Sequence, residues 1–420
     1  MQAVVDFRRL GQDFAAFVAD PTTEASVAYA KRVGLKVSHT SDIRGKRYHI
    51  VRHDKAMYGE GALTMTDEMA LVRSIIIADG KIRCVSLPKT TRKMSDAPVV
   101  TPGRTDTTKS VLLEGPMINV FYYADDACQG DDAAGTGWQI STRSVFGAKN
   151  SFYDDDTGAK LTFRNMFLEA MPTGMTNTLD RGVVYSYVIR HPKNRDVYGV
   201  TTPYLVLVAS FKPRDETNMV WEYAAPDVAG VLSATNEPSM GITAAWADAD
   251  GNLVRAKEMS DKYLTLRKLR GTQPKLKFHF LTLRKQRGAL TQYLAEFPEH
   301  ATVFSAFREE IHGFTKQLQA NYWECFVKRE KQLRDYDGQF KSHMYNLHTQ
   351  FKQTRKPMNI SAVIQYVNSL EPAQLLFSLH WRHRERRSTT METTTATTTA
   401  TATTAASSTS TADTTTDMEQ

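Results

Sequence analysis

The 420-residue sequence lacks the marks of several large protein classes. Its three cysteines, Cys84, Cys128 and Cys325, are too few and too scattered for a disulfide framework or a zinc site, which predicts a reducing intracellular compartment, cytoplasmic or nuclear. No apolar run approaches the roughly 20 residues that cross a bilayer. The N-terminus carries charges inside its apolar stretch, so we expect neither a signal peptide nor a membrane partner.

Common catalytic and nucleotide-binding motifs are also missing. The chain contains no GxxxxGK[ST] loop, no GxGxxG after a strand, no HExxH and no GxSxG. These absences argue against P-loop, dinucleotide-binding, zincin and α/β-hydrolase chemistry. With 41% hydrophobic and 24% charged residues, the composition is that of an ordinary globular protein.

Positive charge is concentrated in the last third of the chain. The formal net charge is +7, but residues 255–387 contain 25 Lys or Arg and 12 Asp or Glu, a net of +13, so the rest sums to −6. Such a block favours a polyanionic partner, because bound cations release the counterions of nucleic-acid phosphates. The alternative is a solvated basic surface on helices.

Local patterns predict an α+β protein with antiparallel sheets and a C-terminal all-helical domain. Short β-rich runs separated by turn signals fill much of the chain from residue 46 to 300, and the Asp79-Gly80 and Asp250-Gly251 pairs predict hairpins. Beyond them, apolar residues follow helical spacing in a stripe that predicts a packed core: Val303, Phe304, Phe307, Ile311, Phe314, Leu318, Tyr322 and Phe326.

These patterns divide the chain into four predicted parts. We expect an N-terminal helical segment (1–45), the α+β domain (46–285), a basic helical domain (286–387) and a tail (388–420). The tail is rich in Thr, Ala and Ser without periodicity, which predicts disorder.

Four separated segments share an order and spacing with a known family. They include RSIII, GKI and LPK within 73–89, EGPMINVF and WQISTR within 114–143, HPKNR within 185–195, and RKLRG within 262–276. Together they resemble the RNA ligase branch of the covalent nucleotidyltransferases, most closely the RNA ligase-like proteins of large DNA viruses. The resemblance covers about residues 45–285 and extends more loosely over the helical region.

The resemblance implies a nucleotidyltransferase domain with an ATP-grasp-like ligase fold. In that family a lysine amine attacks the α-phosphate of ATP and holds AMP as a phosphoramidate. The AMP passes to an RNA 5′-phosphate and is displaced by a 3′-hydroxyl. ATP, Mg²⁺ or Mn²⁺, and RNA are therefore the expected ligands, and a viral origin would place the protein in the host cell or the virion.

The motif residues are only partly retained. The nucleophile position holds Leu112, which cannot form a phosphoramidate, and the nearest substitutes are Lys109 and Lys89. On a regular strand Lys109 and Leu112 would face opposite sides. Positions that the resemblance assigns to nucleotide binding are Glu114, Gly115, Arg143, Ser186 (in place of the family's glutamate), Arg255 and Lys257.

A second basic group follows these positions and is a candidate RNA contact. It consists of Arg267, Lys268, Arg270, Lys275 and Lys277, and the alternative for it is a basic linker into the helical domain.

Several functions stay open at this point. The leading one is an RNA ligase-related protein that binds ATP and RNA ends, and seals RNA if an active lysine exists elsewhere. The runner-up is a non-catalytic RNA-binding or virion-structural protein that reuses the fold, and a capping-type guanylyltransferase is third. The sequence indicates neither the metal ligands nor the oligomeric state.

Overall fold

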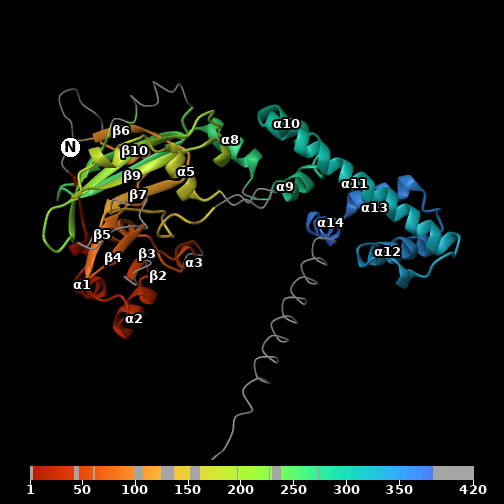
Figure 1. Cartoon of the computed structure of the whole chain (residues 1–420), viewed down its shortest axis with the longest axis horizontal. Coiled ribbons are helices and arrows are strands. Elements are labelled where there is room, and N and C mark those ends of the chain that lie inside the picture. Colours follow the sequence, from red (N-terminus) through yellow and green to blue (C-terminus); the bar gives the residue numbers. More distant parts are fainter. Residues whose placement is uncertain are drawn as a thin grey trace, which may run out of the picture. The chain divides into compact units, whose positions relative to one another are not determined.

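The computed structural model describes residues 3–41, 47–59, 62–98, 107–123, 137–151, 161–195, 197–226, 228, 238–271, 273 and 275–381. Two compact units divide the chain, Met1–Pro274 and Lys275–Gln420 (Figure 1). This division falls N-terminal to the boundary expected at 285/286. The predicted Thr-rich tail at 388–420 lies outside the described residues, as does Cys128.

The N-terminal unit is built around a six-stranded antiparallel sheet (Figure 1). Both of its faces are apolar, and helix α5 (Phe163–Ala170) packs on one while a second sheet packs on the other. In spatial order its strands are β1 (Ala3–Asp6), β11 (Val220–Ala224), β10 (Tyr204–Pro213), β9 (Val184–Arg190), β7 (Met117–Tyr122) and β8 (Trp138–Ser141).

A four-stranded antiparallel sheet forms the second layer. Asp79 and Gly80 join two of its strands and both have positive φ, 50° and 66°, as a two-residue hairpin turn requires. The hairpin predicted at these residues is confirmed. The strand order is β2 (Leu35–Ser41), β3 (Arg47–His53), β4 (Ile75–Ala78) and β5 (Lys81–Val85).

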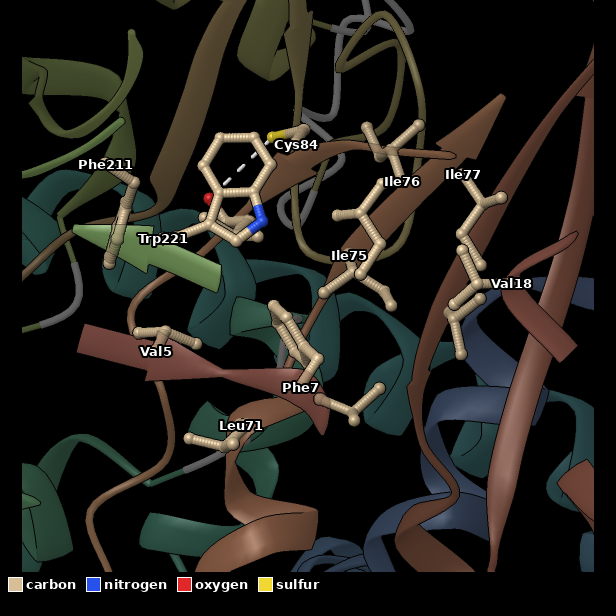
Figure 2. Close-up of a cluster of buried hydrophobic side chains, with 14 of the residues drawn as sticks. Val5, Phe7, Val18, Leu71, Ile75, Ile76, Ile77, Cys84, Phe211 and Trp221 are labelled. Atoms are coloured by element: carbon tan, nitrogen blue, oxygen red, sulfur yellow. Dashed lines mark hydrogen bonds between the residues drawn. The ribbon is translucent and has the colours of Figure 1, made fainter. Parts of the chain in front are cut away.

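The main core lies between these two sheets. Phe211 and Trp221 of the six-stranded sheet share one cluster with Ile75 and Ile77 of the four-stranded sheet, and Val18 of helix α1 (Gln12–Ala19) joins them (Figure 2). All five are at most 3% exposed. Apolar burial at about 25 cal/mol per Å² makes this cluster the principal source of the unit's stability.

A three-stranded antiparallel sheet completes the unit. Its order is β13 (Leu253–Met259), β12 (Gly241–Ala247) and β6 (Thr107–Leu112). The turn predicted at Asp250-Gly251 does join β12 and β13, and Gly251 adopts φ 81° there. The α+β class with antiparallel sheets is thus confirmed.

Short helices surround the sheets. They are α1 (Gln12–Ala19), α2 (Glu24–Arg32), α3 (Lys55–Gly59), α4 (Asp67–Leu71), α5 (Phe163–Ala170), α6 (Met175–Thr178) and α8 (Asp261–Arg270). The first 45 residues, expected to be helical, contain strands β1 and β2 beside α1 and α2. Strand β1 pairs with β11, so this segment contributes an edge of the six-stranded sheet.

The described part of the C-terminal unit, residues 275–381, contains helices and no strand, as predicted. The apolar stripe of its longest helix is buried from Phe304 to Tyr322, and the helix ends in a π-helical turn at Trp323–Val327. Its helices are α9 (Leu276–Leu283), α10 (Ala289–Glu296), α11 (Ala301–Tyr322), α12 (Gly338–Thr354), α13 (Ile360–Ser369) and α14 (Pro372–Leu379). No helix in the described ranges combines the length and apolarity needed to cross a membrane.

Candidate functional site

The register of the three-stranded sheet decides which predicted residues share a face. Ser110, Thr243 and Lys257 are directly paired across β6, β12 and β13, and Leu112 pairs with Gly241 two residues further on. Paired residues in an antiparallel sheet project to the same side, and the side alternates along each strand. Leu112 and Lys257 therefore lie on one face.

Lys109 lies on the other face of the same sheet. It pairs with Ala244, which pairs with Ala256, and this row alternates with the row of Lys257. The odd spacing between Lys109 and Leu112 predicted this opposition, and the register bears it out. Lys109 is solvent-exposed and is removed by geometry from the side chains around Lys257.

Arg255 anchors the face of Lys257 to the interior of the unit. It is 8% exposed, and its Nη1 donates to the carbonyl of Pro88 at 2.7 Å. Arg73 Nη1 donates to the neighbouring carbonyl of Leu87 at 3.5 Å. The Leu-Pro-Lys segment is thus held beside β13, which brings Lys89 to the same region.

Six positive side chains gather here, and we call them the cationic cluster. They come from the segments before β4, after β5 and after β8, from strand β13 and from helix α8: Arg73, Lys89, Arg143, Arg255, Lys257 and Arg267. The Ser74 hydroxyl donates to the carbonyl of Arg143 at 3.0 Å, which ties two of these segments together. None of the six forms a salt bridge with a carboxylate within the described ranges.

The positive charges of the cluster lower one another's pKa values. Burial, followed by the charges of Arg73, Arg255, Arg267 and Lys89, lowers the pKa of Lys257. Burial, then Arg255 and Arg143, lowers the pKa of Arg73 to about 10. Lys257 nevertheless remains solvent-exposed along part of its side chain. The cluster is therefore an accessible concentration of positive charge that lacks a counter-charge among the residues that the structure describes.

One polar atom on this face also lacks a partner. The Oγ atom of Ser110, in the row of Lys257, is buried and has no hydrogen-bond partner among the described residues. A buried hydroxyl without a partner costs free energy, and a bound ligand is one way to satisfy it. Ser110 therefore extends the candidate site along β6.

Glu114 has partners of its own within the protein. It is 5% exposed; its Oε1 accepts from the Val197 N–H at 2.9 Å and the Tyr263 hydroxyl at 3.1 Å, and its Oε2 accepts from the Tyr198 N–H at 2.7 Å. The guanidinium of Arg190 lies 3.7 Å from Oε2. Glu114 thus joins the start of β7 to the end of β9 and to α8, and its expected nucleotide contact stays a prediction.

Gly115 and Ser186 also make contacts that shape the sheet. Gly115 has φ 139°, and a Cβ atom there would lie 2.3 Å from the carbonyl oxygen of Ile189, so the backbone approach requires glycine. Ser186 is fully buried and donates to Oδ1 of Asn119, its direct neighbour across β7 and β9, at 2.8 Å. The expected nucleotide contacts of these two residues likewise remain predictions.

The five predicted RNA contacts divide between the two units. Arg267 and Lys268 are exposed on α8, whereas Arg270 at its end is 6% exposed. Lys275 and Lys277 belong to the C-terminal unit, where Lys277 forms a 2.5 Å ion pair with Glu310. The basic string in the sequence is therefore not one continuous surface of a single unit.

The expected metal ion finds no evident protein site. Within the described ranges, no group of three or more His, Cys, Asp or Glu side chains is arranged to hold an ion. The predicted carboxylate, Glu114, accepts hydrogen bonds at both oxygens. The expected Mg²⁺ or Mn²⁺ therefore stays a prediction.

The sequence motifs contain Arg73 but assign it no function. It stands in the RSIII segment, but only the fold brings it beside Arg255 and Arg143. Its signal in the sequence is weak, namely an arginine immediately before an apolar strand.

Comparisons with known proteins add little. No known protein family matches the chain, and no curated protein matches it. A solved structure described as "Putative ATP-dependent DNA ligase from Aquifex aeolicus" aligns with a TM-score of 0.34 and 11% identity, over 82% of this chain and 87% of the other. Similarity at this level does not establish what this chain does.

Proposed function

We propose that the N-terminal unit binds the triphosphate of ATP at the cationic cluster, and that the protein is an RNA ligase-related protein acting on RNA ends. The supporting observation is the convergence of six cations from separate segments without a carboxylate partner in the described part of the chain. Desolvated cations that repel each other destabilise the empty site. A polyphosphate offsets that cost, as charge clamps do in phosphoryl transfer.

The test is a calorimetric titration of the full chain with ATP, ADP, AMP and pyrophosphate in Mg²⁺. Arg73→Met and Lys257→Met should each weaken ATP binding about 10–100-fold, because a hydrogen bond to a charged group contributes about 1.5–3 kcal/mol. Affinity should decrease from ATP to AMP as phosphates are removed.

Lys109→Met is the matched control. It removes a lysine from the same sheet but from the opposite face. Wild-type affinity in Arg73→Met and Lys257→Met, or an equal loss in Lys109→Met, would show that the phosphates bind elsewhere.

The runner-up function is a non-catalytic RNA-binding protein, in the virion or elsewhere, and Leu112 at the expected nucleophile position favours it. It predicts 5′-phosphorylated RNA binding that falls steeply with salt, and no covalent nucleotide in any metal. Preference for GTP over ATP would instead favour a guanylyltransferase.

A further inference from the structure

The face that holds Leu112 contains another lysine in a suitable setting. Lys257 lies two residues along the sheet from the Leu112 row and two strands across. Spacings of about 3.4 Å per residue and about 4.8 Å per strand put the two Cα atoms roughly 12 Å apart. An extended lysine side chain of about 6 Å, from either position, reaches a common point above β12.

Strand β12 has no side chain beside Leu112. In the Leu112 row its residue is Gly241, which has φ 152° and has no side chain to project. A Cβ atom there would lie 2.0 Å from the carbonyl oxygen of Glu258, so the backbone geometry itself excludes larger residues. The only β12 side chain next to this pair on the same face is therefore that of Thr243, the direct neighbour of Lys257.

We infer that Lys257 is the nucleophile of this protein and forms the covalent bond to AMP that Leu112 cannot form. The inference rests on the proposed binding of ATP at the cationic cluster. The neutral amine attacks the α-phosphorus, a P–N bond forms, and the bond from the α-phosphorus to the bridging oxygen breaks. Pyrophosphate leaves with the electron pair, and the amine releases one proton to water.

The surroundings of Lys257 suit both halves of this step. Burial and the neighbouring cations lower the pKa of Lys257, which increases the neutral, nucleophilic fraction of the amine near neutral pH. The same cations, Arg73 and Arg255 among them, stabilise the departing pyrophosphate. Lys89 belongs to the cluster but lies outside the sheet, and Lys109 points to the opposite face.

The experiment is self-labelling of the full chain with α-³²P-ATP at saturating concentration, followed by mass mapping of the adenylylated peptide. We expect an acid-labile label on Lys257 whose rate of formation rises with pH. Lys257→Arg, which keeps the charge, should reduce labelling at least 100-fold while ATP affinity falls no more than tenfold. Lys109→Arg, on the opposite face of the sheet, should retain the label.

The possible results distinguish the assignment of Lys257 as nucleophile from the proposed binding of ATP. A label that maps to another residue, or that persists in Lys257→Arg, overturns the assignment while leaving ATP binding intact. ATP binding without any label in the wild type overturns it and leaves the site a binding site. If calorimetry detects no ATP binding, the proposed function fails and the inference fails with it.

Discussion

The cationic cluster and the basic C-terminal unit differ in whether their positive side chains form ion pairs with carboxylates. In the C-terminal unit, Lys277 pairs with Glu310 at 2.5 Å and Lys285 pairs with Glu371 at 2.7 Å. In the cluster, Arg73 and Lys257 have only other cations among the charges that shift their pKa values. The C-terminal unit thus contains several neutralised cations, whereas the cluster has none within the described ranges.

This contrast shows why net charge is a poor locator of an anion site. Exposed ion pairs contribute little to stability and leave little potential at the surface. Unpaired cations held together by the fold produce a strong local field and raise the energy of the empty protein. We therefore expect structural cations to be those that form ion pairs with carboxylates, and ligand-binding cations to be those that do not.

The largest expected effect concerns a fully paired cation. Glu114→Ala leaves the buried guanidinium of Arg190 without its carboxylate and removes three hydrogen bonds. We expect the free energy of unfolding to fall by about 3–5 kcal/mol, as measured by urea denaturation. Glu216→Ala, at an exposed carboxylate, is the control and should change it by less than about 0.5 kcal/mol. A loss below 1 kcal/mol in Glu114→Ala would contradict a structural role.

Replacing an unpaired cation should instead stabilise the folded unit. Arg73 has a pKa of about 10, below that of a free guanidinium, so its charge destabilises the folded unit at neutral pH. Arg73→Met should therefore raise Tm by roughly 2–4 °C while it weakens ATP binding. A fall in Tm would show that its bond to Leu87 outweighs the repulsion.

Local patterns in the sequence predict the helices, strands and hairpins, but they do not predict the cationic cluster. Asp79-Gly80 predicted its hairpin because positive φ at two successive residues is a local requirement. The opposition of Lys109 and Leu112 also followed from a local rule, the two-residue period of a strand. The stripe along α11 was predictable for the same reason.

Sheet order is not a local property, and the cluster depends on it. Strand β6 is separated from β12 by more than a hundred residues, yet the register of these strands fixes the face of Lys257. The placement of Arg73 depends in turn on a carbonyl of the segment after β5. Motif resemblance supplied candidates such as Arg143 and Lys257, and their role in binding stays a prediction that the titrations address.

A smaller effect is expected from two histidines, the half-buried His53 of the N-terminal unit and the buried His343 of the C-terminal unit. Burial lowers the pKa values of His53 and His343 below 6.5. The unfolded chain therefore takes up protons first, and stability present above pH 6.5 is lost as the pH falls toward the folded pKa values. The loss is at most about 1.4 kcal/mol per pH unit for each histidine.

The two histidines should respond differently to an anion. The charges of Lys89, Arg73 and Arg143 contribute to the shift at His53, whereas burial alone acts on His343. Pyrophosphate bound at the cluster should raise the pKa of His53 and reduce the acid-induced loss of stability. Urea denaturation of wild type and His53→Gln at pH 7.5 and 5.5, with and without pyrophosphate, measures this. If pyrophosphate changes the acid-induced loss of stability equally in both proteins, the charge of the bound anion does not act on His53.

The smallest effect distinguishes two lysines of the predicted RNA-binding string. Lys277 is paired with Glu310, whereas Lys268 is exposed on α8 without a carboxylate partner in the described part of the chain. Lys268→Ala should weaken binding of 5′-phosphorylated RNA and reduce the slope of log K against log salt by about one. Lys277→Ala should change RNA affinity less than twofold and the free energy of unfolding by less than about 1 kcal/mol. An equal loss of RNA affinity in both variants would mean that pairing in the free protein does not exclude a cation from the RNA interface, because Glu310 can release Lys277 to a phosphate.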